Sequence, residues 1–274
     1  MRCMDRLNSD DIRSIPYTIK GYDLNIKAKI GKSLIELAEY LADDKEIKKR
    51  IFNSKVAVVP ITAGLGIIEG FSEAIVAILE YLGMDAFITQ DTDIAGFSEA
   101  FSKNVDLILS GDDLVFSAFN VNKKKVVDNS FATGRAYAAS LELASKDVKG
   151  KTVVVVGAGR VGLSAIDYLI KKGANIIVIE IDKDKVVELK KRYKKKLILM
   201  NTIDEAIKYS RLILIAAPIA GLLKEHNVNS EMIVSSPAIP LGLTESALKK
   251  LPSNHLIHDP LQLGVVAMVA LALK

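Results

Sequence analysis

Cysteine is nearly absent from this sequence, because Cys3 is the only one among 274 residues. A lone cysteine can form neither an intramolecular disulfide nor a cysteine-based metal site. The three histidines, His226, His255 and His258, form no pair at helical spacing with an acid between them, which a two-histidine zinc site would need. The scarcity of cysteine and histidine predicts that there is no metal cofactor. The lone cysteine also predicts a reducing, cytoplasmic location.

Long apolar runs and an excess of one charge are also lacking. The longest apolar run near the C-terminus, residues 264–273, is too short to span a bilayer, and the first residues have no apolar core of signal-peptide length. The formal net charge is only +4, from 37 basic and 33 acidic residues. The basic runs at 123–125 and 194–196 have no interleaved aromatic residues, which favours solvated surface. We therefore expect no membrane contact and no nucleic-acid partner.

Two α/β patterns follow one another along a chain in which 50% of the residues are hydrophobic. In the first pattern, short apolar runs alternate with helical periodicity, which is typical of an α/β lobe with a mainly parallel sheet. Apolar residues at three- and four-residue steps indicate one further, amphipathic helix before the first strand. The expected strands are 55–61, 86–89 and 106–109, and the expected helices are 30–41, 71–82 and 97–102.

A segment rich in alanine and leucine, residues 129–144, predicts a long helix that joins the two patterns. Strands are then expected after Lys151 and at 175–180, 197–200, 211–217, 232–236 and 255–259. Such a series with helices between the strands predicts a doubly wound Rossmann dinucleotide-binding domain. The predicted division is an N-terminal domain at 1–128, a connecting helix at 129–146 and the Rossmann domain at 147–274.

Three glycines, Gly157, Gly159 and Gly162, form a G-x-G-x-x-G motif between a four-valine strand and an amphipathic helix. The first glycine permits the tight turn, the second lets the backbone approach a pyrophosphate, and the third allows close packing of helix on strand. The helix N-terminus then favours the anion. The predicted cofactor contacts in this turn are Gly157, Ala158, Gly159, Arg160, Val161 and Gly162.

Glu180 ends the next strand, 18 residues after Gly162, where an acid accepts hydrogen bonds from the adenosine ribose and repels a 2′-phosphate. Lys183 and Lys185 would attract that phosphate, but the acid favours NAD over NADP. Loops at the carboxyl ends of later strands line the cofactor crevice in this fold. The further predicted cofactor contacts are Ile181, Ala217, Pro218, Ser236 and Pro237.

In the first lobe, small residues at 62–66 follow the strand at 55–61 and provide backbone N–H groups for a carboxylate. Asp112 and Asp113 follow the strand at 106–109 and emerge at the same edge if the strands are parallel. Paired acids in an apolar cleft can hold an ammonium or accept a proton. The alternative is that they form a turn or an N-cap before residues 115–120.

The strings VVPITAGLGIIEGFSEA, ILSGDDLVFSAFN and SSPAIPLGL, in this order around VGAGRVG, resemble the PylD family of pyrrolysine-biosynthesis dehydrogenases from about Val56 onward. The resemblance implies NAD-dependent oxidation of the terminal amine of lysine-Nε-3-methylornithine, followed by ring closure to pyrrolysine. It also implies a substrate lobe facing the Rossmann lobe, with an N-terminal helix near residues 7–15 that closes over the substrate.

The same resemblance implies that the family's acid falls on Asp112. We expect Asp112, directly or through a water, to orient the amine and take its proton, with Asp113 as its neighbour. Ala63 stands where the family is expected to have serine, and Glu180 replaces an expected aspartate. Two alternatives are a dehydrogenase for another diamine or amino acid and a non-catalytic NAD-sensing module. A homodimer is expected. The substrate contacts that the resemblance implies are Val59, Ile61, Thr62, Ala63 and Gly64.

Overall fold

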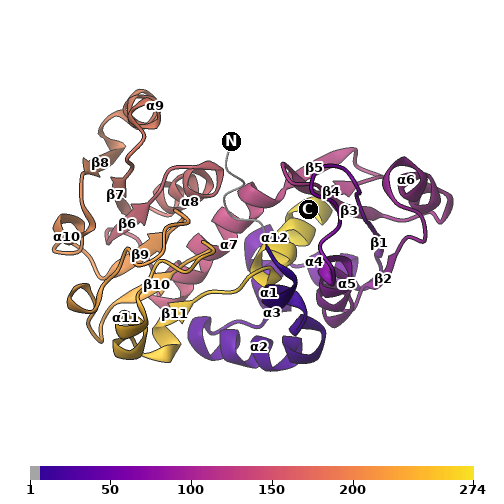
Figure 1. Ribbon diagram of the computed structural model, residues 1–274, viewed down its shortest axis with the longest axis horizontal. Coiled ribbons are helices and arrows are strands. Elements are labelled where there is room, and N and C mark those ends of the chain that lie inside the picture. Colours follow the sequence, from indigo (N-terminus) through magenta and orange to yellow (C-terminus); the bar gives the residue numbers. More distant parts are fainter. Residues whose placement is uncertain (1–6) are drawn as a thin grey trace. The chain divides into compact units, whose positions relative to one another are not determined.

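The computed structural model describes residues 7–274, which fall into two compact units (Figure 1). Unit 1 contains Ala28–Gly31 and Gly134–Asp259, and unit 2 contains residues 7–27, Lys32–Thr133 and Pro260–Lys274. Cys3, discussed above, lies outside the described residues. Two helices, α2 (Ile15–Ile30) and α7 (Asn129–Ala144), begin in unit 2 and end in unit 1.

Unit 1 is built on a six-stranded sheet in the order β11-β10-β9-β6-β7-β8. All of its strand pairs are parallel. From β6 the chain first adds β7 and β8 on one side and then crosses to β9, β10 and β11 on the other, as the doubly wound prediction requires. The strands are β6 (Thr152–Val156), β7 (Asn175–Ile179), β8 (Leu197–Met200), β9 (Leu212–Ile215), β10 (Ile233–Ser235) and β11 (Leu256–Ile257).

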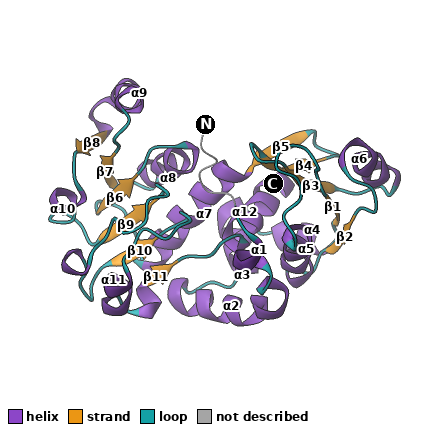
Figure 2. Cartoon of the chain, in the orientation of Figure 1, coloured by secondary structure: helices purple, strands orange, loops and turns teal. Residues whose placement is uncertain are grey.

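Both faces of this sheet are buried, which accounts for its runs of valine and isoleucine. Val154 and Val156 belong to a core on one face, whereas the alternate residues Val153 and Val155 are fully buried on the face packed by α8. Helices lie on both sides of the strands in Figure 2. Those of unit 1 after α7 are α8 (Arg160–Lys171), α9 (Lys183–Tyr193), α10 (Ile203–Ala206) and α11 (Glu245–Lys250), with 3₁₀ turns at Lys194–Lys196, Glu225–Asn227 and Ser253–His255.

Unit 2 contains a five-stranded sheet in the order β2-β1-β3-β4-β5. The strands β2, β1 and β3 are parallel, as predicted, but β4 and β5 extend the sheet as an antiparallel hairpin that the sequence did not predict. The residues after Asp113 therefore form a strand, and no helix is capped there. The strands are β1 (Lys55–Val59), β2 (Asp85–Ile88), β3 (Leu107–Gly111), β4 (Phe116–Asn120) and β5 (Lys125–Asp128).

One face of the unit 2 sheet packs on α6 through a core that includes Ala57, Val59, Ala100 and Ile108. The intervening residues of β1, such as Val58, are buried as well, so this sheet also has two covered faces. The helices of unit 2 are α1 (Ser9–Ile12), α3 (Leu34–Ala42), α4 (Ile47–Phe52), α5 (Phe71–Tyr81), α6 (Asp93–Ser102) and α12 (Gln262–Leu273), together with most of α2.

The last helix, α12, is buried at every residue from Gln262 to Leu273. It packs against α3, α4, α5, β4 and β5, which are all elements of unit 2. The predicted domain at 147–274 therefore differs from the observed division, in which Pro260–Lys274 belongs with unit 2. The physical reason is that a helix that is apolar all round has to be buried on every side.

Cations surround the C-terminal end of α12. Lys125 Nζ donates to Leu271 O at 2.7 Å, and Leu273 O accepts from Lys123 Nζ at 2.7 Å and from Arg50 Nη1 at 2.9 Å. Burial, with neighbouring positive charges, lowers the pKa of Lys125. The run at 123–125 was predicted to be solvated surface. Lys123 and Lys124 are exposed, whereas Lys125 is half-buried, and cations at a helix C-terminus stabilise the unpaired carbonyls.

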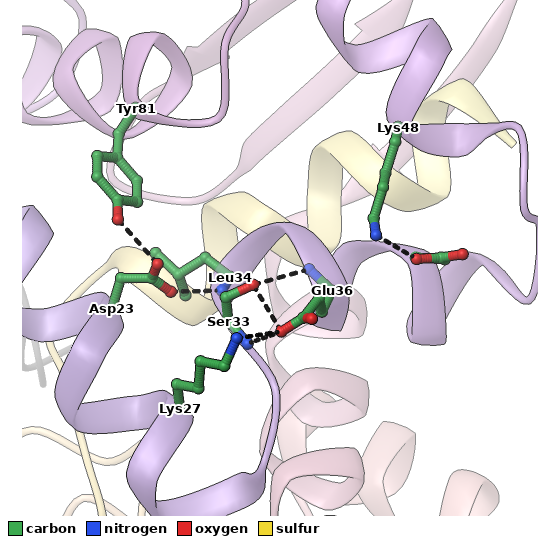
Figure 3. Close-up of polar contacts among 8 residues, drawn as sticks. Asp23, Lys27, Ser33, Leu34, Glu36, Lys48 and Tyr81 are labelled. Carbon is green, nitrogen blue, oxygen red and sulfur yellow. Dashed lines mark hydrogen bonds and ion pairs between the residues drawn. The ribbon is translucent and has the colours of Figure 1, made fainter.

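A polar network joins α2 to α3 and α5 inside unit 2 (Figure 3). Asp23 accepts from Leu34 N at 2.6 Å and from the Tyr81 hydroxyl at 2.8 Å. Ser33 and Glu36 form a reciprocal capping box at the start of α3. The helix predicted at 30–41 therefore begins later than expected. α2 ends just before Gly31, whose φ is 73°, and α3 starts only after the Ser33 cap.

Within residues 7–274, none of the helices is both long and apolar enough to traverse a bilayer. The same residues contain no cluster of three or more histidine, cysteine, aspartate or glutamate side chains suited to holding a metal ion.

Candidate functional site

The turn between β6 and α8 requires glycine at two of its three motif positions. Gly157 has a φ of 88°, and a Cβ there would lie 2.9 Å from Ala217. A Cβ on Gly162 would lie 2.0 Å from the Gly157 carbonyl oxygen. At Gly159 an added Cβ meets nothing within 4 Å. The protein itself therefore leaves open space beside Gly159, where a pyrophosphate approaches the backbone in this type of turn.

The N-terminus of α8 has room for an anion. Gly159 is the N-cap residue and provides no side-chain cap, so the first N–H groups of the helix are not satisfied by a capping side chain. Arg160 follows directly and is exposed. Backbone donors, the helix dipole and a nearby guanidinium together suit a diphosphate.

Glu180 lies at the end of β7, next to this turn. Its Oε2 accepts from Ala158 N at 2.8 Å, and its Oε1 accepts from Ile181 N at 2.8 Å and from Asp182 N at 2.9 Å. These three bonds fix the carboxylate without using all of its acceptor positions, of which a carboxylate has about four. Lys185 Nζ lies 3.9 Å from the carboxylate of Asp182. Glu180, the acid predicted to accept hydrogen bonds from the ribose, is therefore already held in place by the protein's own backbone.

The loops after β9 and β10 lie at the same carboxyl edge. Ala217 packs against Gly157, and Pro218 and Pro237 are half-buried. Ser236, by contrast, is fully buried, and its hydroxyl lies 3.5 Å from Ile215 O. Only the backbone of Ser236 is therefore suited to line a ligand. Ile181 is 81% exposed.

In unit 2, the loop after β1 is fastened by an acid that sequence reasoning missed. Asp93, the first residue of α6, accepts from Thr62 N at 2.9 Å and from the Thr62 hydroxyl at 2.6 Å. These bonds lower the pKa of Asp93. Its own N–H donates to Pro60 O at 3.0 Å. Thr62 is thus occupied by a protein partner on both its N–H and its hydroxyl.

Asp113 meets the same loop, as expected for residues at the carboxyl ends of neighbouring parallel strands. Its Oδ2 accepts from Leu65 N at 2.6 Å, and a Cβ on Gly64 would lie 2.1 Å from that oxygen. The loop therefore already holds one carboxylate by a backbone N–H. Ala63 is exposed and Ile61 is half-buried, but Val59 is buried in the core, so the Val59 side chain points away from the loop surface.

Asp112 begins the tight connection from β3 to β4. Its Oδ1 accepts from Leu114 N and Val115 N, both at 2.8 Å. These backbone hydrogen bonds, the one from Val115 first, lower the pKa of Asp112. The residue thus forms the turn that was the alternative interpretation, and its exposed carboxylate stays ionised at neutral pH. An ionised carboxylate with a lowered pKa suits an ion pair with an ammonium better than proton acceptance.

The segment at 7–15, which the resemblance implies to be a lid, contains the short helix α1. Asn8 caps α1 through its side chain, and Asp11 completes a capping box. The Ser9 hydroxyl donates to Glu69 O at 3.3 Å, and Ile12 is fully buried. α1 therefore lies against the segment that leads into α5 within unit 2.

A second polar group that the sequence did not reveal lies beside β10 and β11 in unit 1. The buried Tyr137 hydroxyl contacts Asp259, and His258 Nδ1 lies 2.7 Å from Ser236 O. Tyr137 lies mid-helix in the Ala-rich segment and is 122 residues from Asp259, so only the fold brings them together. The signal that was present is the pair His258 and Asp259 at the end of a strand.

The parallel sheet that reverses at β6, the glycine turn and the acid at the end of β7 define a Rossmann-type dinucleotide-binding fold. Solved structures agree on the fold. The chain is similar to shikimate dehydrogenase from Aquifex aeolicus, with 17% identity, a TM-score of 0.53 and coverage of 79% of this chain and 90% of that one. It is similar to quinate dehydrogenase from Corynebacterium glutamicum in complex with NAD, with 14% identity, a TM-score of 0.54 and coverage of 80% and 93%.

Sequence comparison then gives the family. Residues 11–127 match the N-terminal domain of the pyrrolysine biosynthesis protein PylD, and residues 139–237 match shikimate/quinate 5-dehydrogenase. The pyrrolysine synthase of Methanosarcina acetivorans is 33% identical over 78% of this chain and 81% of that protein. That of Methanosarcina barkeri is 31% identical over 90% and 94%. The chain belongs to the pyrrolysine synthase (PylD) family.

Proposed function

We propose that this protein is a pyrrolysine-biosynthesis dehydrogenase. In this proposal it oxidises the terminal amine of L-lysine-Nε-3-methyl-D-ornithine with NAD, and the product cyclises to L-pyrrolysine. The observation that carries the proposal is the similarity to pyrrolysine synthases along most of the chain. The glycine turn and Glu180 supply the features that a nicotinamide dinucleotide needs.

The choice of NAD is supported by Glu180. Its fixed carboxylate presents acceptors to the two hydroxyls of an unphosphorylated ribose and repels a 2′-phosphate. The pyrophosphate would bind at Gly159 and the N-terminus of α8. When bound, NAD supplies the acceptor for a hydride.

The proposed reaction oxidises the amine before the ring closes. The ammonium of the substrate loses a proton, because its carbon releases a hydride only when the nitrogen lone pair is free. Loss of the hydride leaves a protonated imine, which water converts to an aldehyde and ammonium. The aldehyde then condenses with the ornithine α-amine, releasing water and forming the C=N bond of the pyrroline ring.

Substrate binding is proposed for the edge of unit 2 that carries Asp112, Asp113 and residues 61–64. Asp112 would hold the ammonium, because its lowered pKa keeps the carboxylate charged. The exposed backbone at Ala63 and Gly64 would approach the substrate. Thr62 and Asp113 would keep the loop in shape through their bonds to Asp93 and Leu65.

The direct experiment mixes the protein with NAD and lysine-Nε-3-methylornithine, follows NADH at 340 nm and weighs the product. The expected result is NADH formation together with the mass of pyrrolysine. Ornithine and lysine, tested separately, check for a dehydrogenase of simpler amines. A faster reaction with either of them, or NAD binding without any reduction, would contradict the proposal.

A further inference from the structure

Asp93 has a backbone conformation that its own helix does not explain. It is the first residue of α6, and its φ of 54° lies in the left-handed region, which is costly for residues with a Cβ, although aspartate and asparagine tolerate it best. An acid in a first helical turn can stabilise the free N–H groups of that turn, yet both carboxylate oxygens of Asp93 accept from Thr62. The reason for this conformation therefore lies outside the helix.

The contact takes up both polar donors of Thr62. Asp93 Oδ1 accepts from Thr62 N at 2.9 Å, and Oδ2 accepts from the Thr62 hydroxyl at 2.6 Å. Asp93 N donates in turn to Pro60 O at 3.0 Å, so the main chain and the side chain of one residue fasten two points of the segment after β1. The hydroxyl proton of Thr62 is therefore engaged within the protein.

A second carboxylate holds the other side of the same loop. Asp113, which follows β3, accepts from Leu65 N at 2.6 Å. Strand β1 lies between β2 and β3 in the sheet, so the two acids come from the connections that follow its two neighbours, all within unit 2. The loop is thus fixed at Thr62 and Leu65, and Ala63 and Gly64 form the tip between these fixed points.

The start of α6 is held independently of the Asp93 carboxylate. Glu99 Oε2 accepts from Gln90 N at 2.7 Å and from Asp91 N at 3.1 Å. A Cβ on Gly96 would lie 2.5 Å from Asp91 O, so the helix also packs closely on the connection from β2. Loss of the Asp93 side chain should therefore release the loop after β1 and leave α6 in place.

We propose that Asp93 is a positioning residue for substrate binding. By fixing Thr62 it holds the backbone of Ala63 and Gly64 in the arrangement that contacts the substrate at the edge of unit 2. An ordered loop binds more tightly than a mobile one, because the entropy of ordering is lost before the substrate arrives. The inference rests on the proposed function, and it gives the Thr62 hydroxyl the task of ordering the loop in place of contacting the substrate.

Two substitutions at position 93 separate the carboxylate from the backbone. Glycine and asparagine both tolerate a positive φ, but only asparagine can still accept from Thr62 N and donate to its hydroxyl. We expect Asp93→Gly to raise KM for the isopeptide about tenfold or more, because hydrogen bonds to a charged group are lost. Its kcat and NAD affinity should stay within about twofold of the parent, since only substrate binding is affected. Asp93→Asn should restore KM to within about threefold of the parent, as a neutral pair keeps most of the geometry.

Glu99→Ala is the matched control, because its carboxylate bonds to the connection before α6 and to Lys103. This variant should lower the melting temperature and keep KM for the isopeptide near the parent value. A parent-like KM for Asp93→Gly would overturn the proposal. So would a KM for Glu99→Ala raised as far as that of Asp93→Gly, or an Asp93→Asn variant as impaired as Asp93→Gly, because helix support or charge alone would then account for the effect.

Thr62→Val tests the same contact from its other side, since valine keeps the size of threonine without the hydroxyl. We expect it to raise KM in the parent and to add nothing further in the Asp93→Gly background. An equal rise in both backgrounds would mean that the hydroxyl binds the substrate directly, which contradicts the proposed role of Asp93.

Hydrogen exchange of the Thr62 and Leu65 amides gives a readout that needs no turnover. Exchange should be faster in Asp93→Gly and in Thr62→Val than in the parent, and parent-like in Asp93→Asn and Glu99→Ala. Unchanged exchange in Asp93→Gly, or in Thr62→Val if the glycine variant does not fold, excludes an ordering role for Asp93. If the parent itself fails to oxidise the isopeptide, the proposed function fails, while exchange still decides whether Asp93 orders the loop.

Discussion

Glu180 ties the glycine turn to β7 through its hydrogen bond from Ala158 N, and we propose that the same carboxylate binds the ribose of NAD. Replacing Glu180 with Ala is expected to lower kcat/KM for NAD by about tenfold or more, because a charged hydrogen-bond acceptor contributes about 1.5–3 kcal/mol. The same change removes the repulsion of a 2′-phosphate near Lys183. Steady-state kinetics with both cofactors measure the effect.

The informative quantity in that experiment is the ratio of the two efficiencies. Glu180→Asp serves as the control, because it keeps the charge and is expected to preserve the preference for NAD. An Ala variant that leaves the ratio of NAD to NADP efficiencies unaltered would show that Glu180 does not select the cofactor.

Gly159 and Gly162 should respond differently to alanine. Gly159→Ala meets no protein atom and has an ordinary φ of −69°, so the melting temperature should stay within about 2 °C while NAD affinity falls. Gly162→Ala forces a Cβ to within 2.0 Å of the Gly157 carbonyl and should lower the melting temperature clearly. Thermal denaturation and isothermal titration with NAD separate the two effects. Equal NAD affinity for Gly159→Ala and the parent would exclude a close approach of the pyrophosphate.

Asp112 is proposed to hold the substrate ammonium. Asp112→Asn keeps an acceptor for the Leu114 and Val115 N–H groups but loses the charge, so the hairpin should fold. We expect NAD binding to be unchanged and kcat/KM for the isopeptide to fall about 10- to 100-fold, since a paired charge is worth about 1.5–3 kcal/mol. Asp106→Asn is the control, because its Oδ2 accepts from Lys55 N at the opposite end of β3. Near-parent efficiency for Asp112→Asn would assign Asp112 to the turn alone.

At the level of elements, we expect the stability of the start of α3 to depend on pH. Hydrogen bonds from the Ser33 backbone and hydroxyl lower the pKa of Glu36 to about 2, compared with about 4.3 for an unperturbed glutamate. The stabilisation is therefore complete above about pH 4.3 and is lost as the pH falls toward 2. Because the Glu36 side chain is 36% exposed, solvent screening keeps the effect below about 1 kcal/mol.

Glu36→Gln tests this dependence. Urea denaturation should find the variant less stable than the parent at pH 7 and nearly equal to it close to pH 2. Glu39→Gln, on the same helix, loses only the ion pair with Lys48 at 2.7 Å and serves as the control. A stability difference for Glu36→Gln that does not change with pH would rule out the carboxylate as its source.

The elements with a strong repeating pattern were predictable from the sequence. α7 matches the predicted 129–144, and β1, β6 and β7 begin within one residue of their expected starts or at them. The hairpin β4-β5 was missed because its strands, FSAFN and KVVD, mix polar with apolar residues and lack the continuous apolar runs of strands such as β1 and β6. α2 was missed although it buries Ile15, Ile19, Ile26 and Ile30 on one stripe; its many polar residues hid the pattern.

The candidate site was also predictable only in part. The glycine turn and the acid after β7 lie within one short stretch of sequence, so their spacing alone predicted that they meet. The partner of Thr62 is Asp93, 31 residues away, and the Tyr137–Asp259 contact joins residues much farther apart. Such pairs depend on which strands become neighbours, and that information is not contained in any short window of the sequence.

For the whole molecule, α12 is held by residues far away in the chain. Lys123→Met removes donors to Leu273 O and Lys274 O and should lower the melting temperature of unit 2, since each such cation is worth about 0.3–1 kcal/mol. Hydrogen exchange at the end of α12 should rise. Lys124→Met, in the same turn, is the matched control. Equal exchange in the two variants would mean that the cations do not stabilise the helix end.

The return of α12 to unit 2 also sets an order of folding. Asn120 of β4 donates to Ala272 O across 152 residues, and every residue of α12 is part of the buried interior. A chain synthesised from its N-terminus has therefore made all of the unit 1 sheet before unit 2 can close. Until α12 is made, its partners in unit 2 keep an apolar face uncovered. Unit 2 is therefore the first unit to begin folding and the last to finish. The protein is most exposed to aggregation between the synthesis of these partners and the docking of α12.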